Sequence, residues 1–529
     1  MKDLQALKTL LFPAAEREAF LESIRAQLSP AQFEAVATVF GLSSELMVAL
    51  EQKRQSIARL RAMVFGAKTE SGTNVCGGPA KERTARGGRR RGHGRRSQKT
   101  YTGARRIPVA HTVVRPGQKC PGCGRGKLRA QKPATTVKVT AQPPVGAVIH
   151  ELERLRCDTC GELFTAKAPS EARGEKFDPS VGVLVGLLRY GSGMPFHRLE
   201  RLQQAVGVPL PASVQWEQAL RTAGALEAVV DHMQYLGAQS AVFYNDDTTM
   251  RIASVRKQIQ AETDPERTGI FTTGIVCEGT GPETPSIRLL FTGRQHAGEN
   301  LGRVMKKREA GSEKPLHMCD ALDRNHPPEQ ATDLCKCLIH ARRQFVEIRT
   351  SFPAECRRVV ETFAVVYRVE AECRKEKLDP DQRLRRHQAQ SQSVMEALKA
   401  EFEVDLAAGK VEPNSGLGKA IDYLLKRWES LTRFLTTPGA PLDNNITERL
   451  LKSSILHRKN SLHYRTQKGA DVGDGFMTVI ETCRANDANP FDYMLALVRN
   501  QDAVKASPGD WMPWNYKERL VQTAAPRAP

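Results

Sequence analysis

The stretch SAVFYNDDTT at 240–249 decides the fold, because it joins an apolar run to two adjacent acids. A short apolar run bounded by polar turn residues is typical of a buried strand. Further strands are predicted at 250–255, 269–277, 286–292 and 314–320. Residues 340–435 are charged and poor in strand signals, which predicts helices. Strands followed by a helical block indicate an α/β domain that carries a helical insertion.

Helices are predicted upstream of these strands. Residues 196–206 and 212–220 read as two helices separated by Gly207 and a short turn that contains proline. This pattern resembles a helix-turn-helix, although many helical hairpins share it. Residues 1–70 also read as helical. Heptad-like apolar spacing there indicates either an amphipathic helix packed on its own domain or a dimer zipper, and it involves Leu46, Leu50, Ile57, Leu60 and Val64.

A strongly basic stretch follows the N-terminal helices. Residues 81–106 contain eleven Lys or Arg and one acid, Glu82, so they supply +10 of the formal charge of +20. Because this stretch has almost no apolar residues, it cannot bury enough surface to fold alone. We expect a flexible tether that also lies along DNA phosphates. Its candidate DNA contacts are Arg89, Arg90, Arg91, Arg95 and Arg96.

The whole chain has 529 residues, of which 79 are Lys or Arg and 59 are Asp or Glu. At roughly 150 residues per domain, this length predicts three or four domains. No run approaches the roughly 18 apolar residues that span a bilayer, and the N-terminus lacks the pattern of a signal peptide. We therefore expect a cytoplasmic protein without membrane contact, and the positive charge predicts a polyanionic partner such as nucleic acid.

Two cysteine pairs follow the basic stretch, CPGCG at 120–124 and CDTCG at 157–161. In each CxxC pair a tight turn lets two thiolates share a metal, and the glycine lets backbone amides face the sulfurs. The four thiolates would complete a tetrahedral structural Zn²⁺ site. The ligands would be Cys120, Cys123, Cys157 and Cys160. Disulfides are the alternative, but they are disfavoured in a cytosolic protein.

Two predicted strands end in acids, Asp246 and Asp320, and a third acid, Glu448, lies in a predicted helix start. Three carboxylates from separate segments are the ligands that a pair of Mg²⁺ ions needs. Two such ions roughly 4 Å apart can activate an attacking oxygen and stabilise a leaving oxygen in phosphoryl transfer. A chain with 59 acids offers many such trios, and an aspartate at a strand end is often only a turn residue.

Several strings along the chain carry a resemblance to a known family. They are VFG at 64–66, DDT at 246–248, LIHARRQF at 338–345, DNNITER at 443–449, RKN at 458–460, NPFDYM at 489–494 and DWMPWN at 510–515. With the basic stretch and the cysteine pairs, they make the sequence resemble the insertion sequence 66 family of bacterial transposases. The resemblance implies a multidomain α+β protein. Its ribonuclease-H-like α/β core would carry an all-helical insertion and follow a helical N-terminus, a zinc ribbon and a helix-turn-helix-like domain.

The resemblance also implies a set of catalytic residues. Asp246 matches the first acid of the family's Asp-Glu-Thr-Pro string, which here reads Asp-Asp-Thr-Thr, so Asp247 is a rival ligand. Asp320 is the candidate for the second aspartate, with Asp323 as the alternative. Glu448 matches the third acid within a complete motif. These three residues would hold two catalytic Mg²⁺ ions.

Basic residues near these acids would contact DNA phosphates. They are Arg342, Arg343, Arg449, Lys452, Arg458 and Lys459. The predicted boundaries are 1–70 for the helical N-terminus, 71–107 for the basic linker, 108–170 for the zinc ribbon, 171–236 for the helix-turn-helix-like domain, 237–344 and 439–485 for the two parts of the core, 345–438 for the helical insertion, and 486–529 for a C-terminal helix and tail.

The function implied by the resemblance is that of an Asp-Asp-Glu transposase. Such an enzyme binds the terminal inverted repeats of its element and catalyses metal-dependent strand cleavage and strand transfer. Its partners would be double-stranded DNA of the ends and the target, further copies of itself in a synaptic complex, and small companion proteins of the same element. It would be associated with the bacterial nucleoid. The alternatives are a catalytically inactive DNA-binding regulator derived from a transposase, and a two-metal nuclease.

Overall fold

The computed structural model describes residues 14–42, 113–121, 123, 125, 127–129, 144–156, 163–262, 267–279, 284–327 and 332–524. The predicted heptad seam at 46–64, the basic stretch at 81–106, and both Cys157 and Cys160 lie outside these residues. The chain divides into two units, of which one is Pro79–Gly146 and the other is formed by Met1–Gly78 and Ala147–Pro529. Among the described helices, none has the length and apolar character needed to cross a membrane.

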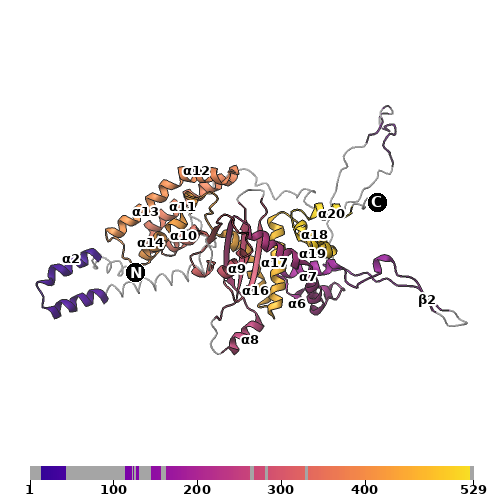
Figure 1. The fold of residues 1–529 in the computed structure, drawn as a ribbon, viewed down its shortest axis with the longest axis horizontal. Helices are drawn as coiled ribbons and strands as arrows, with labels where there is room; N and C mark the ends of the chain where they lie inside the picture. The colour runs from indigo at the N-terminus through magenta and orange to yellow at the C-terminus, as the bar shows by residue number, and fades with distance from the viewer. Residues whose placement is uncertain are drawn as a thin grey trace. The chain divides into compact units, whose positions relative to one another are not determined.

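A five-stranded mixed sheet forms the centre of the larger unit, and its strand order is β5-β4-β3-β6-β7 (Figure 1). Its strands are β3 (Val242–Thr249), β4 (Phe271–Glu278), β5 (Ile287–Gly293), β6 (Leu316–Cys319) and β7 (Asp333–Lys336). The first three strands form an antiparallel meander, whereas β6 and β7 run parallel to β3. The predicted mixed α/β character is confirmed.

The strand predicted at 250–255 is wrong. Residues Ala253–Ala261 form helix α8, and only Ile252 makes an isolated bridge, which pairs it with Tyr464. Val255 and Ile259 are the buried residues of α8, and their four-residue spacing places them on one helix face. Strand β7 was not predicted, since it has only four residues and a charged residue at each end.

Helix α17 (Gln467–Ala485) covers the outer edge of the sheet. It presents Asp474, Thr478 and Thr482 at intervals of four residues to the edge strand β5. These side chains accept hydrogen bonds from the backbone amides of Thr292 (2.5 Å), Leu290 (3.1 Å) and Arg288 (3.1 Å) respectively. The helix therefore satisfies edge amides that would otherwise be free to pair with another chain.

Several helices before and after the sheet pack together next to α17. They are α5 (Pro179–Gly186), the π-helical turn η3 (Leu187–Gly191), α6 (Phe196–Ala205), α7 (Ala212–Ala238), α18 (Pro490–Arg499), α19 (Gln501–Ala506), η6 (Pro508–Trp511) and α20 (Tyr516–Ala524). The two helices of the predicted helix-turn-helix are α6 and α7, and Gly207 between them has a φ of +77°. Helix α7 continues well beyond residue 220 and buries Leu226, Val229 and Met233.

The chain between β7 and α16 (Asn445–Ser461) contains helices and no strand, as the sequence of this stretch predicted. These helices, which we call the helical block, are α10 (Leu338–Glu347), α11 (Pro353–Glu376), α12 (Pro380–Gln390), α13 (Gln392–Ala407), α14 (Gly416–Lys426), α15 (Trp428–Leu431) and η5 (Arg433–Leu435) (Figure 1). Their core includes Phe345, Phe363 and Phe402 and continues into Val242 and Leu316 of the sheet. Phe434 is buried in this cluster, and the partly buried Trp428 packs against it.

The remaining described elements are short. The N-terminal residues form α2 (Ala14–Arg25), and the rings of Phe20 and Phe40 lie 5.8 Å apart. Strands β1 (Arg154–Arg156) and β2 (Leu163–Thr165) form an antiparallel hairpin. The turn η2 (Ser170–Ala172) follows the hairpin, α9 (Ala297–Met305) follows β5, and η4 (Asp323–Asn325) follows β6.

Candidate active site

The three predicted acids lie near one another at one end of the parallel strands. Tyr244 of β3 is paired with Met318 of β6, so Asp246 and Asp320 each lie two residues further along neighbouring strands. Glu448 lies in the first turn of α16, which packs against β3 and β4. The helix start is fixed to the sheet because the Asn444 side-chain amide donates a hydrogen bond to the Asn245 carbonyl (2.9 Å). The fold thus brings three segments of the chain together.

The neighbouring carboxylates affect the ionisation of Asp246. Burial raises the pKa of the Asp246 carboxyl to about 7, although the hydrogen bond from the Asp247 amide lowers it. The nearby carboxylates of Asp320, Asp247 and Glu448 raise that pKa further. No ion pair to Asp246, Asp320 or Glu448 is found within the described part of the chain. The repulsion between these carboxylates is therefore not relieved by an ion pair to any of the three acids among the described residues.

Asp247, the rival of Asp246, points to the opposite face of the sheet, as the alternation of a strand requires. Its carboxylate pairs with His296 Nδ1 at 3.1 Å and with the Arg324 guanidinium at 3.6 Å. Only 3% of its side chain is exposed. His296 also starts α9, where it forms a capping box with Glu299. Asp247 is thus engaged in holding α9 and the loop after β6 against the sheet.

Asp320 and Asp323 also differ in their surroundings. The Asp320 carboxylate accepts hydrogen bonds from the Leu322 amide (3.0 Å) and the Asn325 side chain (2.6 Å). It lies near enough to Asp246 to raise the pKa of that carboxyl. Asp323 begins the turn η4 and is exposed. Of the two candidates for the second aspartate, Asp320 is the one that faces Asp246.

A buried polar network lies beneath the three acids. Asn245 is fully buried, and its side chain donates to the Asn325 carbonyl (2.8 Å) and contacts His317 Nε2 (2.9 Å). Burial lowers the pKa of His317 to about 3, so the imidazole is neutral and can donate to the Asn245 oxygen. Asn325 in turn donates to Asp320. The network links β3, β6 and η4, and thereby fixes the position of Asp320 relative to β3.

Lys336 of β7 is a second support for Asp320, and sequence reasoning missed it. The lysine is 4% exposed, and its Nζ donates to the Asp320 carbonyl (2.5 Å) and to His326 Nε2 (2.6 Å). Burial and the charge of Lys336 lower the pKa of His326, so its Nε2 can accept this bond. A lysine in a short strand carries no local signal of this role, because its partners come from other segments.

The predicted DNA-contact residues fall into three groups. Arg449, Lys452 and Lys459 are exposed along α16. Arg458 is instead bonded to the side chain of Thr248 and to Thr249 at the end of β3. Arg342 and Arg343 are half-buried on α10. Burial lowers the pKa of His340 most, and the charge of Arg343 lowers it further. The carboxylates of Asp320 and Glu448 raise that pKa, so His340 lies near these acids.

The donor set of the site suits a hard divalent cation, since it consists of carboxylates without sulfur. Asn444 Oδ1 and His340 Nδ1 are also buried there without a hydrogen-bond partner in the described structure. Across the described residues, however, no group of three or more His, Cys, Asp or Glu side chains is arranged as a metal site. The carboxylates thus influence each other's ionisation without converging on one point.

Antiparallel segments flank both cysteine pairs in the chain. Lys119 and Lys127 form an antiparallel bridge on either side of Cys120 and Cys123. Strands β1 and β2 flank the second pair, whose own residues are outside the described structure. Cys120 is half-buried and Cys123 is exposed. The predicted zinc site therefore remains a prediction.

Comparisons with known proteins extend over most of the chain. It is 24% identical to the uncharacterized protein y4jD of Sinorhizobium fredii (strain NBRC 101917 / NGR234) over 440 residues, which cover 79% of this chain and 82% of the relative. It is 25% identical to the uncharacterized protein y4hP of the same strain over 442 residues, which cover 79% of this chain and 77% of the relative. Residues 175–472 match the transposase IS66 family. Because this match covers more than half of the chain, the protein belongs to the IS66 family of transposases.

Proposed function

We propose that this protein is an Asp-Asp-Glu DNA transposase that cleaves the ends of its element and joins them to target DNA. The observation that carries the proposal is the meeting of Asp246, Asp320 and Glu448 from β3, β6 and α16. The five-stranded mixed sheet and the helical block before the Glu448 helix support a ribonuclease-H-like core with an insertion.

In the proposed mechanism, Asp246, Asp320 and Glu448 would hold two Mg²⁺ ions. When bound, the ions would activate the attacking oxygen and stabilise the leaving oxygen of each phosphoryl transfer. Water attacks the phosphodiester at each end of the element, so that one P–O bond forms and the bond to the 3′ oxygen breaks. The freed 3′ hydroxyl then attacks a target phosphodiester, again with one P–O bond formed and one broken. No covalent bond between protein and DNA is needed.

The chain's own residues keep the site in position during these steps. Asn444 holds the start of the Glu448 helix on β3. Asn325 and Lys336 fix the side chain and the backbone of Asp320. A rigid supporting shell matters because a reacting group misplaced by 1 Å can lower the rate about 100-fold. We assign Asp247 to this supporting role and not to metal binding, because His296 and Arg324 already engage its carboxylate.

The N-terminal modules would bind the ends of the element. Four thiolates, from Cys120, Cys123, Cys157 and Cys160, would hold a structural Zn²⁺. The antiparallel segments on either side of each pair support this assignment, because they bring the two ends of each cysteine-containing segment close together. The basic stretch at 81–106 would add contacts to phosphates. Pairing two DNA ends requires at least two protomers, and companion proteins of the element would be further partners in the nucleoid.

One assay separates this function from its alternatives. A labelled duplex carrying the terminal repeat is incubated with the protein, Mg²⁺ and a supercoiled target. Joined product supports the transposase, cleavage without joining supports a two-metal nuclease, and binding without either supports a regulator. Glu448→Gln should abolish cleavage and joining while end binding persists, because it removes a metal ligand and no DNA contact.

A matched control is Glu403→Gln on α13, which removes an exposed carboxylate that pairs with Lys399 at 3.6 Å. It should leave both reactions unchanged. If Glu448→Gln still joins ends, or if both variants lose activity equally, the assignment of Glu448 is wrong.

A further inference from the structure

Two segments far apart in the sequence form one surface next to the proposed site. The segment 249–261 contains α8, and the segment 449–470 contains most of α16 and the turn into α17. The Ala253 amide donates to the Tyr464 carbonyl, and the Tyr464 amide donates to the Arg251 carbonyl, both at 2.9 Å. Arg458 adds bonds to Thr249. Helix α8 is therefore fixed against the far end of the Glu448 helix.

Both segments are basic and contain no acid. Together they carry nine Lys or Arg and no Asp or Glu, and the nine are Arg251, Arg256, Lys257, Arg449, Lys452, Arg458, Lys459, Arg465 and Lys468. All except Arg458 are exposed. The next acid after α8, Glu262, is bonded by Arg294 at 2.7 Å. The acids Glu448 and Asp471 flank the second segment, but within the described residues no salt bridge involves any of the nine cations. We call these two segments the basic surface.

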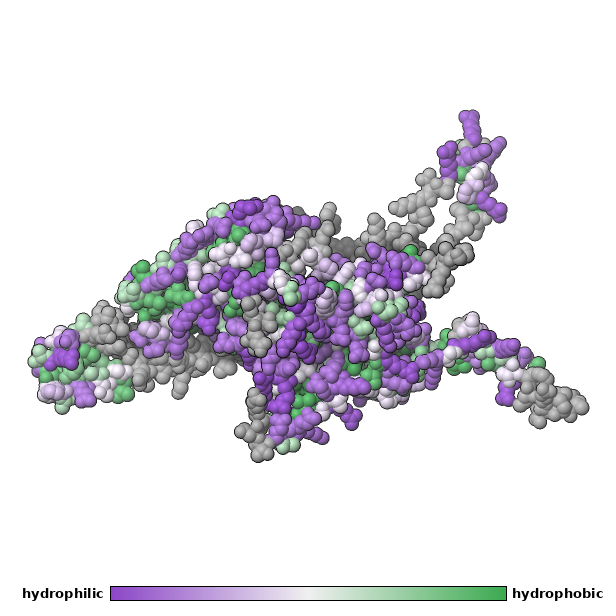
Figure 2. Space-filling view, in the orientation of Figure 1, coloured by the Kyte–Doolittle hydropathy of each residue, from purple (hydrophilic) through white to green (hydrophobic). Residues whose placement is uncertain are grey.

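The form of the basic surface matches a chain of phosphates better than a single anion. The eleven residues from Arg449 to Lys459 span about 15 Å of helix. One DNA strand places a charge every 3.4 Å along the duplex axis, so this length covers about four phosphates. Figure 2 shows that hydrophilic residues dominate the surface in view where Figure 1 labels α9 and α16. Repeated cations over such a length are typical of backbone contacts.

The absence of exposed aromatic residues argues for duplex over single-stranded DNA. Proteins that bind single strands stack the bases on aromatic side chains. The only aromatic side chain among Trp, Tyr and Phe in the two segments is Tyr464, which is 3% exposed. Its ring stacks on His457 at 4.5 Å in the protein interior. The basic surface thus offers charge without a platform for bases.

We infer that the basic surface binds the phosphate backbone of double-stranded DNA and holds the duplex beside Glu448 without reading its sequence. The inference rests on the proposed function for the identity of the DNA that lies there. It adds α8 to the DNA-binding residues, although α8 lies about 190 residues before the Glu448 helix in the sequence.

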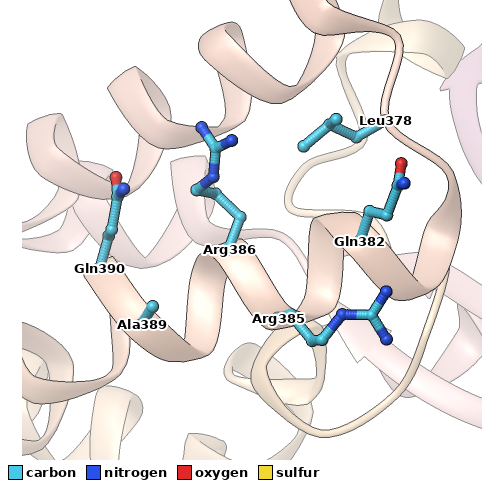
Figure 3. A pocket seen from close by; sticks show the side chains of 6 residues that line it. All are labelled: Leu378, Gln382, Arg385, Arg386, Ala389 and Gln390. Atoms are coloured by element: carbon cyan, nitrogen blue, oxygen red, sulfur yellow. The ribbon is translucent and has the colours of Figure 1, made fainter.

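The test neutralises two adjacent cations of α8. The variant Arg256→Gln with Lys257→Gln is compared with Arg385→Gln and Arg386→Gln, two adjacent cations of α12. Figure 3 shows the side chains of Arg385 and Arg386 on α12. Both line a cavity of about 400 Å³. Arg386 already pairs with Glu376 at 2.9 Å. The control therefore removes the same charge from the helical block, away from the basic surface.

Binding to a duplex of arbitrary sequence is measured by fluorescence anisotropy in EDTA, between 50 and 300 mM KCl. The α8 variant should bind about tenfold or more weakly, and the slope of log K against log salt should become less steep by about two, since each phosphate contact contributes about 0.9. The α12 variant should keep the wild-type slope. Thermal melting establishes that both variants are folded.

Equal slopes for wild type and the α8 variant would overturn the inference, and so would an equal loss in the α12 variant. Stronger binding of single strands than of duplex would also overturn it. The proposed function is tested separately, by wild-type joining in Mg²⁺. If wild type fails to cleave while the α8 variant loses its salt slope, the proposed function fails and the basic surface stands. If wild type joins ends and the slopes are equal, only the basic surface fails.

Discussion

The helical block and the basic surface are both rich in cations, but they use them differently. In the helical block many cations meet a carboxylate of the same block. Such pairs are Arg374 and Arg383 with Glu370, Arg386 with Glu376, Lys426 with Asp422, and Arg433 with Glu429. In the basic surface, nine cations are gathered without an acid. The net charge of a region therefore does not indicate where a polyanion binds. What indicates it is whether the cations of that region are paired with carboxylates.

The buried centre of the helical block shows what such pairing achieves. Glu370 is 6% exposed and is bonded by Arg383 (2.7 Å), Arg374 (2.8 Å) and His387 (3.2 Å). Arg383 also donates to the Ala440 carbonyl (3.0 Å), in the loop that leads to the Glu448 helix. These charged side chains form internal contacts that join α11, α12 and that loop. Apart from Arg458, which is bonded to Thr248 and Thr249, the cations of the basic surface make no comparable contacts within the described structure and are free to bind a partner.

The largest expected effect is on stability, from Glu370→Gln. Removing this carboxylate leaves Arg383 and His387 buried without their partner, which should destabilise the protein by about 3–5 kcal/mol. Chemical denaturation measures the change. The control Glu376→Gln, whose side chain is 47% exposed, should cost less than about 1 kcal/mol. The DNA affinity of the folded Glu370→Gln protein should equal that of wild type. If the fully folded variant binds DNA more weakly, the helical block also contributes to DNA binding.

The next effect is on DNA affinity, from Arg449→Gln combined with Lys452→Gln on the basic surface. Two lost phosphate contacts should weaken duplex binding about tenfold or more and make the salt slope less steep by about two. Because both side chains are exposed, the free energy of unfolding should stay within about 0.5 kcal/mol of wild type. Anisotropy and denaturation are measured on the same samples. A large loss of stability with unchanged DNA affinity would contradict this prediction, because Arg449 and Lys452 would then stabilise the fold and not bind DNA.

The pH dependence of the Glu370 network gives a third, graded effect. Burial raises the pKa of Glu370, but the His387 hydrogen bond and the charges of Arg383 and Arg374 outweigh it and bring the pKa to about 2. The pKa is thus lower in the folded than in the unfolded state. The stabilisation is complete above the unfolded pKa and is lost as the pH falls from about 4.5 through about 2.

The difference in stability between wild type and Glu370→Gln should therefore shrink over this pH range. Denaturation curves at several pH values measure it. A difference that stays constant from pH 6 to pH 2.5 would show that Glu370 does not act through its charge.

The smallest effect is expected from Lys426→Gln on α14. Lys426 pairs with Asp422 one helical turn away at 3.0 Å, and both side chains are more than half exposed. Exposed pairs of this kind contribute about 0.3–0.5 kcal/mol. Denaturation at low salt should detect a change of that size, and DNA affinity should remain at the wild-type value. A tenfold loss of affinity would place the helical block in the DNA interface as well.

Particular residues show how far the sequence could lead. Asp246 and Glu448 were placed in one site, and strands β3, β4, β5 and β6 were predicted within a few residues, because apolar runs ending in polar residues are a local signal. The strand predicted at 250–255 failed because Val255 and Ile259 also fit a helix face, and a short apolar run does not distinguish the two. The choice between Asp246 and Asp247 needed His296 and Arg324, which come from other segments.

The sequence by itself determined the class of fold, the helical character of the block before Glu448, the acids of the candidate site and the membership of the IS66 family. These features depend on local patterns and strings. Only the tertiary structure decided which face each acid occupies, which buried groups support Asp320, and that α8 joins α16 in one basic surface. Such features depend on contacts between segments far apart in the chain, and the packing of the sheet and its helices creates those contacts.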